Sequence, residues 1–178
     1  CLPGWRAGDA RCEKDIGRRI GLATGAASSL NCIWASKDLC HQTKIRVYQS
    51  LVLSILTYNS ETWTLKETDK HRLRVFEMAV LRRICGVSLK DRWRNEDIKA
   101  MLGITDDITR VIQKKRLTYF GHVVRMDKER IPKIMVDGRL HGVRPVGRPR
   151  KKWIDGIVED CDEMGIPLIQ AIRSAEDR

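Results

Sequence analysis

The clearest chemical signal in the sequence is a basic, proline-containing stretch at residues 144–152. Prolines hold a backbone extended and disfavour helix. The side chains of Arg148 and Arg150 can therefore reach into the narrow minor groove of DNA. Lys151 and Lys152 are then placed to contact phosphates. We predict that this stretch, which begins at Arg144, contacts nucleic acid; a basic linker or a nuclear-import signal is the alternative.

The core of the stretch, Gly147-Arg148-Pro149, resembles that of an AT-hook, an extended segment that lies in the DNA minor groove. The resemblance is incomplete, because an AT-hook usually has a second arginine just before its glycine and this chain has Val146 there. Recognition of A·T-rich DNA is therefore one hypothesis for the stretch, and general contact with phosphates is the other.

The positive charge of the chain is concentrated around this stretch. The 178 residues carry 34 Lys and Arg against 23 Asp and Glu, which gives a net charge of +11. Residues 111–152 hold 13 basic and 3 acidic side chains, a net +10, whereas residues 153–178 hold 2 and 7, a net −5. Such segregation predicts a phosphate-binding surface, although a solvated face that keeps the protein soluble has the same composition.

Residues outside the stretch are further candidates for nucleic-acid binding. Arg110, Lys114 and Lys115 lie mostly away from the apolar side of a predicted helix, where they can contact phosphates. Trp93 lies between Arg92 and Arg94 and is the best candidate for stacking on a base. The other tryptophans include two expected core anchors, Trp34 and Trp63.

Catalytic chemistry has little support in the sequence. Asp106 and Asp107 are paired acids of the kind that hold metal ions in a polymerase. They precede an apolar periodic run, however, where such residues are ordinary helix caps. His71 and His122 have no serine or cysteine partner at a spacing typical of a triad. We therefore predict no catalytic residue and no cofactor.

The six cysteines are expected to be reduced, intracellular thiols, because no secretory signal precedes them and none forms a Cys-x-x-Cys pair. Only Cys40 and His41 are neighbours, so no metal site is predicted. Cys32, Cys85 and Cys161 fall on apolar faces and are expected to pack in the core.

The apolar periodicity predicts a mainly α fold, a bundle of about five to seven helices with an irregular N-terminus and a basic extended loop. Helices are expected at residues 13–35, 42–58, 68–85, about 108–126 and 152–164, with a short one from Asn95 as N-cap to Gly103 and a short terminal one. The helix at 42–58 has the broadest apolar surface and is the expected central core helix. After Pro132 the chain is expected to be irregular.

Two classes of protein are excluded by the apolar pattern. No run of about 18 apolar residues occurs, so no membrane span is predicted. The N-terminus has no apolar region of the kind that a secretory signal requires. The first residue is Cys1 rather than methionine, and we expect the chain to be a fragment of a longer protein.

Several runs of residues together resemble one family. The runs, in order, are residues 12–16 with 18–20, 44–58, Glu61-Thr62-Trp63-Thr64-Leu65, Leu81-Arg82-Arg83-Ile84-Cys85-Gly86-Val87, 117–126 and 147–153. In this order they are similar to the C-terminal part of a LINE-type (non-LTR) retrotransposon endonuclease–reverse transcriptase, of the RTE-like kind. The resemblance spans nearly the whole chain, and the order of the runs makes it specific.

The resemblance implies that the catalytic aspartates of the polymerase lie upstream of this chain, so the chain as it stands is expected not to be an enzyme. It also implies four segments: a remnant of the palm edge at 1–12, a helical thumb-like domain at 13–130, a basic Pro/Gly-rich arm at 131–152, and acidic C-terminal helices at 153–178. The N-terminus departs from the family, because Cys1-Leu2-Pro3-Gly4-Trp5 stands where a Tyr-Leu-Gly strand is expected.

The sequence therefore predicts a non-catalytic fragment of an RNA-directed DNA polymerase that binds an RNA–DNA hybrid or DNA through a basic surface. The missing polymerase palm is a further expected partner, and neither a membrane nor a small-molecule substrate is expected. The expected location is the nucleus, or a cytoplasmic ribonucleoprotein before import. The alternatives are a domesticated DNA-binding protein that uses the AT-hook-like arm, and a residual interaction protein without nucleic-acid function.

Overall fold

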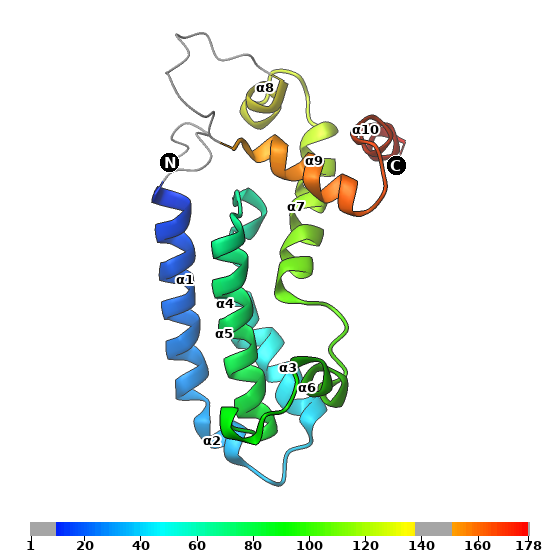
Figure 1. The fold of residues 1–178 in the computed structure, drawn as a ribbon. Coiled ribbons are helices and arrows are strands. Elements are labelled where there is room, and N and C mark those ends of the chain that lie inside the picture. Colours follow the sequence, from blue (N-terminus) through cyan, green and yellow to red (C-terminus); the bar gives the residue numbers. More distant parts are fainter. Residues whose placement is uncertain (1–9, 138–150, 178) are drawn as a thin grey trace. The chain divides into compact units, whose positions relative to one another are not determined.

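The structure is a computed structural model that describes residues 10–137 and 151–177. These residues are mainly helical and include no strand, which confirms the predicted mainly α fold (Figure 1). Among them, no helix has both the length and the hydropathy that a membrane span requires.

The chain forms two compact units, which interleave along the sequence. The first unit contains Cys1–Cys12, Ser60–Leu65 and Ile112–Arg178, and the second contains Glu13–Asn59 and Lys66–Val111. This division differs from the four predicted segments, whose assignment to palm, thumb, arm and tail stays a prediction. The structure does not describe residues 138–150, so most of the predicted arm lies outside the described residues.

The second unit is built mainly from two long helices and the shorter helices around them. Its elements are α1 (Ala10–Ser29, whose first turn belongs to the first unit), α2 (Asn31–Ala35), α3 (His41–Val47), the π-helix η1 (Tyr48–Leu53), α4 (Ser54–Leu56), α5 (Glu67–Cys85), the 3-10 turn η3 (Leu89–Asp91) and α6 (Asn95–Leu102). Helix α1 lies beside α5 (Figure 1), and a Cβ on Gly17 would lie 3.3 Å from the Arg72 side chain.

The predicted helix at 42–58 is one helical run with a π-helical middle. Ile45, Tyr48, Val52 and Leu56 are buried along it, as a central helix requires, but Leu51 is 48% exposed. A π-helix has more residues in each turn than an α-helix, so residues on either side of η1 face directions that a 3.6-residue period does not give. The broad apolar surface predicted for residues 42–58 includes Leu51, which lies inside η1, and its expected burial was wrong.

Two helices of this unit end as their glycines predict. Gly86 follows α5 with φ 68° and Gly103 follows α6 with φ 67°, both in the left-handed region. The amide of Val87 donates to the Arg82 carbonyl at 3.0 Å, which satisfies a carbonyl of the last turn. Glycine is needed at such a position because a Cβ there is strained.

Two glycine-to-alanine changes in the second unit should act in opposite directions. Gly86→Ala should lower the free energy of unfolding by about 1–2 kcal/mol, because alanine must adopt a positive φ. Gly21→Ala should raise it by about 0.5–1 kcal/mol, because Gly21 lies inside α1 and an added Cβ meets nothing within 4 Å. Urea denaturation of the two variants checks the signs, and a change of the same sign in both would contradict this account.

The first unit packs α7 against the C-terminal helices. Its helical elements are the 3-10 turn η2 (Ser60–Thr62), most of α7 (Ile108–Val124, which begins in the second unit), α8 (Ile131–Asp137), α9 (Trp153–Glu163) and α10 (Leu168–Glu176). One cluster of its buried core contains Phe120, Val124, Trp153, Ile157 and Cys161. The indole of Trp153 packs near Phe120 and donates from Nε1 to the Glu61 carbonyl at 2.8 Å.

Several local predictions differ from the structure. The predicted helix at 13–35 is divided at Leu30, which has φ −94° and ψ 15°. Asn95 is the first residue of α6 and Arg94 occupies the cap position. Residues 131–137 form α8 where an irregular chain was expected, because Pro132 stands in the first turn, where its missing N–H costs no helical hydrogen bond.

Candidate nucleic-acid interface

The predicted phosphate-binding residues of α7 are exposed, as their position opposite the apolar stripe requires. Lys114 and Lys115 lie on the part of α7 that belongs to the first unit, and Ile112 and Phe120 of the same helix are buried. Arg110, four residues before Lys114, is also exposed, and its Nε lies 3.7 Å from Asp106. An exposed pair of this kind is weak in water, so the guanidinium stays available to a phosphate.

Arg116 is the residue of this basic run that the sequence prediction omitted, and it is not exposed. Its guanidinium is buried and forms a two-point ion pair with Asp160 of α9, in which Nε lies 2.5 Å from Oδ2 and Nη2 donates to Oδ1. Nη1 donates to the Trp63 carbonyl at 3.4 Å. The sequence contains a signal for this burial, because residue 116 lies four residues from both Ile112 and Phe120 on the apolar stripe.

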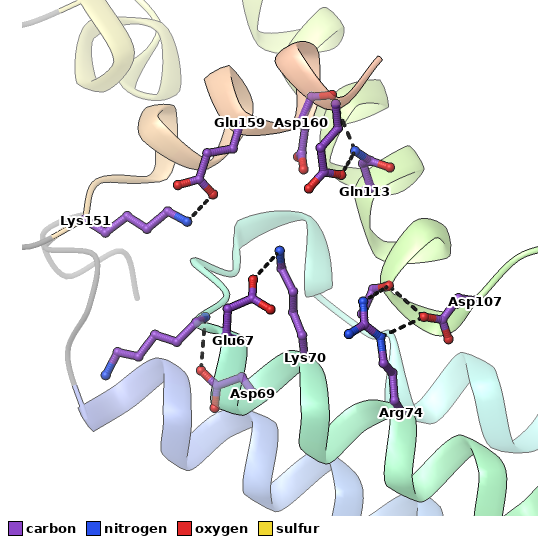
Figure 2. A network of polar contacts seen from close by, with 12 residues as sticks. Glu67, Asp69, Lys70, Arg74, Asp107, Gln113, Lys151, Glu159 and Asp160 are labelled. Carbon is purple, nitrogen blue, oxygen red and sulfur yellow. Dashed lines mark hydrogen bonds and ion pairs between the residues drawn. The ribbon is translucent and has the colours of Figure 1, made fainter. Parts of the chain in front are cut away.

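The buried ion pair between Arg116 and Asp160 contributes to the packing of α7 against α9, and we do not assign it a ligand. Burial raises the pKa of Asp160, while the hydrogen bonds and charge of Arg116 act in the opposite direction. Gln113 donates to the Asp160 carbonyl at 3.4 Å and to Glu163 at 2.9 Å (Figure 2). These contacts tie α7 to α9 and leave the exposed lysines of α7 on the solvent side.

Trp93 lies in an exposed loop after the η3 turn, with 45% of its surface accessible. One Arg82 nitrogen, Nη2, donates to the Trp93 carbonyl at 3.1 Å and to Asn95 Oδ1 at 2.8 Å. Asp91 accepts from the amide and the hydroxyl of Ser88 at 2.7 and 2.9 Å, which closes the turn before Trp93. The loop is thus held at both ends, and the indole remains accessible to a base.

The basic stretch at 144–152 is described only at its end. Arg144, Arg148 and Arg150 lie outside the described residues, as does the AT-hook-like core. Lys151 pairs with Glu159 of α9 (Figure 2). The Lys152 amide donates to Asp155 at 2.7 Å and so caps α9, while the Lys152 side chain is exposed. Phosphate contact by this stretch stays a prediction.

Asp107 has the capping role that was predicted for it. Its Oδ1 accepts from the Ile108 amide at 2.9 Å, and its carbonyl accepts from the amides of Arg110 and Val111. The carboxylate also binds Arg74 Nε at 2.9 Å (Figure 2) and Lys99 Nζ at 3.1 Å. Hydrogen bonds to Glu77, Arg74 and Lys99 lower the pKa of Asp107 against the effect of its partial burial.

Glu77 of α5 is the second carboxyl of this network, and it was not singled out in the sequence. It is 3% exposed, and its Oε2 lies 3.5 Å from Lys99 Nζ and 3.4 Å from the Ile108 amide. Burial raises the pKa of Glu77 to about 7, and the neighbouring Asp107 adds to the rise. Within the part of the chain that the structure describes, the buried Tyr48 hydroxyl has no hydrogen-bond partner. Burial raises the pKa of Tyr48, and Glu77 and Asp107 add to the rise, so this hydroxyl belongs to the same charged surroundings.

The thiols and histidines form no recognisable catalytic or metal centre in the part of the chain that the structure describes. No group of three or more His, Cys, Asp and Glu side chains there is arranged to hold a metal ion. No described cysteine is in a disulfide. Cys161 is buried as predicted and Cys85 is half-buried, but Cys32 is exposed, because α2 buries Trp34 instead.

The two tryptophans predicted as core anchors are buried, and stacking of a base on Trp93 stays a prediction. Trp34 is 3% exposed and donates from Nε1 to the Ala27 carbonyl at 2.7 Å, and Trp63 is 2% exposed. Both are core anchors, in contrast to the exposed Trp93. Trp34 and Trp63 therefore stabilise the core, whereas the indole of Trp93 is accessible to a ligand.

Fold and sequence together define a mainly α, strongly basic protein, and exposed lysines and arginines occur on α7 and in the loop around Trp93. The chain is 34% identical over 127 residues to an uncharacterized transposon-derived protein of Caenorhabditis elegans. The match covers 67% of this chain and 45% of the relative, so the chain spans less than half of that protein. This similarity supports a transposon-related origin. No known family and no solved structure matches the chain.

Proposed function

We propose that this chain is a non-catalytic part of a non-LTR retrotransposon reverse transcriptase, containing the thumb and the basic segment beyond it, and that it binds nucleic acid. The observation that carries the proposal is the ordered series of runs between residues 12 and 153 that resemble this family. The similarity to a transposon-derived protein supports the same origin at a coarser level.

The placement of the candidate residues supports a binding role. Lys114 and Lys115 are exposed on α7, and Trp93 is exposed between two exposed arginines. Lysine and arginine contacts to phosphates are independent of base sequence, and a tryptophan face accepts any base. The chain would therefore bind through backbone charge and shape, as recognition of an A-form RNA–DNA hybrid requires.

We do not propose that Asp106 and Asp107 form a polymerase active site. Asp106 and Asp107 are paired acids, but Asp107 caps α7 and binds Arg74 and Lys99. A carboxylate that is already neutralised by two cations is a poor ligand for a catalytic metal ion. In the family that the chain resembles, the catalytic aspartates belong to an upstream segment. We therefore propose binding without nucleotide incorporation.

The test is the affinity of the purified chain for an RNA–DNA hybrid, an A·T-rich duplex and a G·C-rich duplex across a salt series. Contact with about 6–10 phosphates should weaken binding by ~10³–10⁵ between 50 and 200 mM salt. A steep salt dependence with preference for the hybrid is the expected result. No binding at 50 mM salt would contradict the proposal and would favour a residual protein without nucleic-acid function.

Paired substitutions assign the binding to a surface. Lys114→Ala with Lys115→Ala should make the plot of log affinity against log salt concentration less steep. The expected change corresponds to the loss of roughly two phosphate contacts and is the same for every nucleic-acid sequence. Lys14→Ala with Arg18→Ala is the matched control, because these exposed cations lie on α1 and are not in the proposed surface. If the control pair lowers affinity as much as the α7 pair, only net charge is involved and the assignment to α7 fails.

The AT-hook-like core at residues 147–149 favours one second candidate, a domesticated DNA-binding protein. In that case Arg148→Ala with Arg150→Ala should remove a preference for A·T-rich duplex over the hybrid. Under the first proposal the same pair weakens binding to all three nucleic acids and flattens the salt dependence. The ranking of the three nucleic acids before and after this substitution distinguishes the two candidates.

A further inference from the structure

One pocket in the second unit is lined by cations and by no carboxylate. Its volume is about 900 Å³, and its walls come from α2, from α3 with the loop before it, and from the end of α5. The cationic or basic side chains among its lining residues are Lys37, His41, Lys44 and Arg83, whereas no aspartate or glutamate lines it. A concave site with this charge attracts anions, because no acidic side chain among its lining residues weakens the positive potential.

The environment of Lys44 is a second, independent indication of a ligand. Its side chain is buried, with 6% of the residue exposed, and its ammonium donates to the Trp34 carbonyl at 2.7 Å. Among the described residues, no carboxylate is paired with this ammonium, although its charge lowers the pKa of the neighbouring Cys85 thiol against the effect of burial. A buried charge whose partner is a neutral carbonyl is only partly compensated, and an anion in the pocket would complete the compensation.

The other basic residues of the pocket are exposed. Lys37 is exposed in the loop between α2 and α3, and His41 is exposed at the start of α3. Arg83 is exposed and donates from Nη1 to Asn31 Oδ1 at 3.3 Å, a neutral acceptor. The loop before α3, α3 itself through Lys44, and the end of α5 thus each bring a cation to one pocket whose lining includes no acidic residue.

We propose that this pocket binds a terminal phosphate monoester of a nucleotide. Such a phosphate carries about −1.5 to −2 charges at pH 7 and three acceptor oxygens, so it suits several cations better than an internal phosphodiester with a single charge. The pocket is large enough for a nucleotide and too small for a duplex. The terminal phosphate belongs either to a free nucleotide or to the end of a strand, and the second source rests on the proposed function.

Cys40 provides a local readout, because its thiol lines the pocket and is exposed. The hydrogen bond between Cys40 Sγ and Thr43 Oγ1, at 3.2 Å, lowers the pKa of this thiol, which favours the reactive thiolate. Cys32 is also exposed but does not line the pocket, so it serves as an internal reference. A ligand in the pocket should slow alkylation of Cys40 and leave that of Cys32 unchanged.

The experiment measures the alkylation rates of Cys40 and Cys32 by iodoacetamide in the full chain, with peptide mass spectrometry as the readout. The probes are AMP with adenosine as its control, and a 5′-phosphorylated oligonucleotide with its 5′-hydroxyl form as control. AMP and the phosphorylated oligonucleotide should protect Cys40 at concentrations at least about tenfold lower than their controls. Protection by AMP alone would support the site and assign it to free nucleotides.

Lys37→Gln with Arg83→Gln should weaken protection of Cys40 by about tenfold or more, since each change removes a charge-assisted contact. Lys14→Gln with Arg18→Gln is the charge-matched control and should leave protection unchanged. The inference would be overturned if neither phosphate probe protected Cys40. It would also be overturned if adenosine protected Cys40 as well as AMP does and the 5′-hydroxyl oligonucleotide protected it as well as the 5′-phosphorylated one does. Loss of hybrid binding with intact protection by AMP would overturn only the proposed function.

Discussion

Asp160→Ala should lower the free energy of unfolding of the first unit by about 3–5 kcal/mol. The reason is that Arg116 and Asp160 are both buried, with 5% and 6% of their side chains exposed. Removal of the carboxylate leaves the guanidinium without a counter-charge in an environment that water does not reach. Urea denaturation measures the change, and hydrogen exchange in α9 shows that the first unit is the part affected.

The neighbouring residue on the same helix is the matched control. Glu159 pairs with Lys151, and 53% of the Glu159 side chain is exposed. Glu159→Ala should therefore change stability by less than about 1 kcal/mol. A cost for Asp160→Ala no larger than that for Glu159→Ala would show that the buried ion pair is not formed in solution.

A double substitution distinguishes two contributions to the free energy of unfolding: the cost of leaving Arg116 without a counter-charge, and the stabilisation that the ion pair itself provides. Arg116→Met with Asp160→Leu removes both charges and keeps apolar volume in the core. We expect this variant to recover most of the stability that Asp160→Ala loses. A double variant as unstable as Asp160→Ala would instead show that the ion pair itself stabilises the unit.

The stability of the second unit should fall as the pH rises from about 4.5 to 7, because the pKa of Glu77 is raised to about 7 in the folded chain. In the unfolded chain the same carboxyl ionises near its ordinary value, so the folded state binds more protons across this range. Ionisation of the buried group then costs on the order of 3 kcal/mol by pH 8. Urea denaturation at pH 5, 6, 7 and 8 measures this loss.

Asp107 does not offset this dependence. Its pKa is lowered in the folded chain, so its stabilising contribution is complete above its ordinary value near 3.8 and is lost only in stronger acid. The charged groups that face Glu77 are Lys99 and Asp107, with Arg74 on the far side of Asp107. Lys99 favours the ionised form of Glu77, but desolvation is the larger effect.

Glu77→Gln should flatten the pH dependence between pH 5 and 8 and should stabilise the unit at pH 8. Glutamine has nearly the same shape, and it can still accept from the Ile108 amide. Glu67→Gln on the same helix is the control, because the Glu67 side chain is 79% exposed and pairs with Lys70 at 2.8 Å (Figure 2). An unchanged slope in Glu77→Gln would mean that another group titrates in this range.

Local sequence signals predicted several elements of the second unit. The helix predicted at residues 68–85 begins within a residue of α5 and ends at the same residue, and Leu73, Phe76, Val80 and Ile84 form its buried stripe. The same reasoning placed Asp107 at the start of α7. These predictions succeed because helical periodicity, capping and positive φ depend on residues within a few positions of one another.

The candidate site was predicted less completely. The exposed positions of Lys114, Lys115 and Trp93 follow from the helical pattern and from the loop around Trp93. The cationic pocket was not predicted, because Lys37, His41 and Arg83 come from segments up to 46 positions apart. Their shared wall depends on how α2, α3 and α5 pack, and no local pattern encodes that packing.

The sequence by itself determined that this protein is mainly helical, where most helices begin and end, and which lysines of α7 face water, because these properties arise from neighbours along the chain. Only the tertiary structure decided that Arg116 pairs with Asp160, 44 residues away, and that Glu77 is desolvated beside Asp107. The chemical state of a charged side chain depends on burial and on partners brought together by packing. The helical pattern therefore separates Lys115 from Arg116, but it does not identify Asp160 as the partner of Arg116.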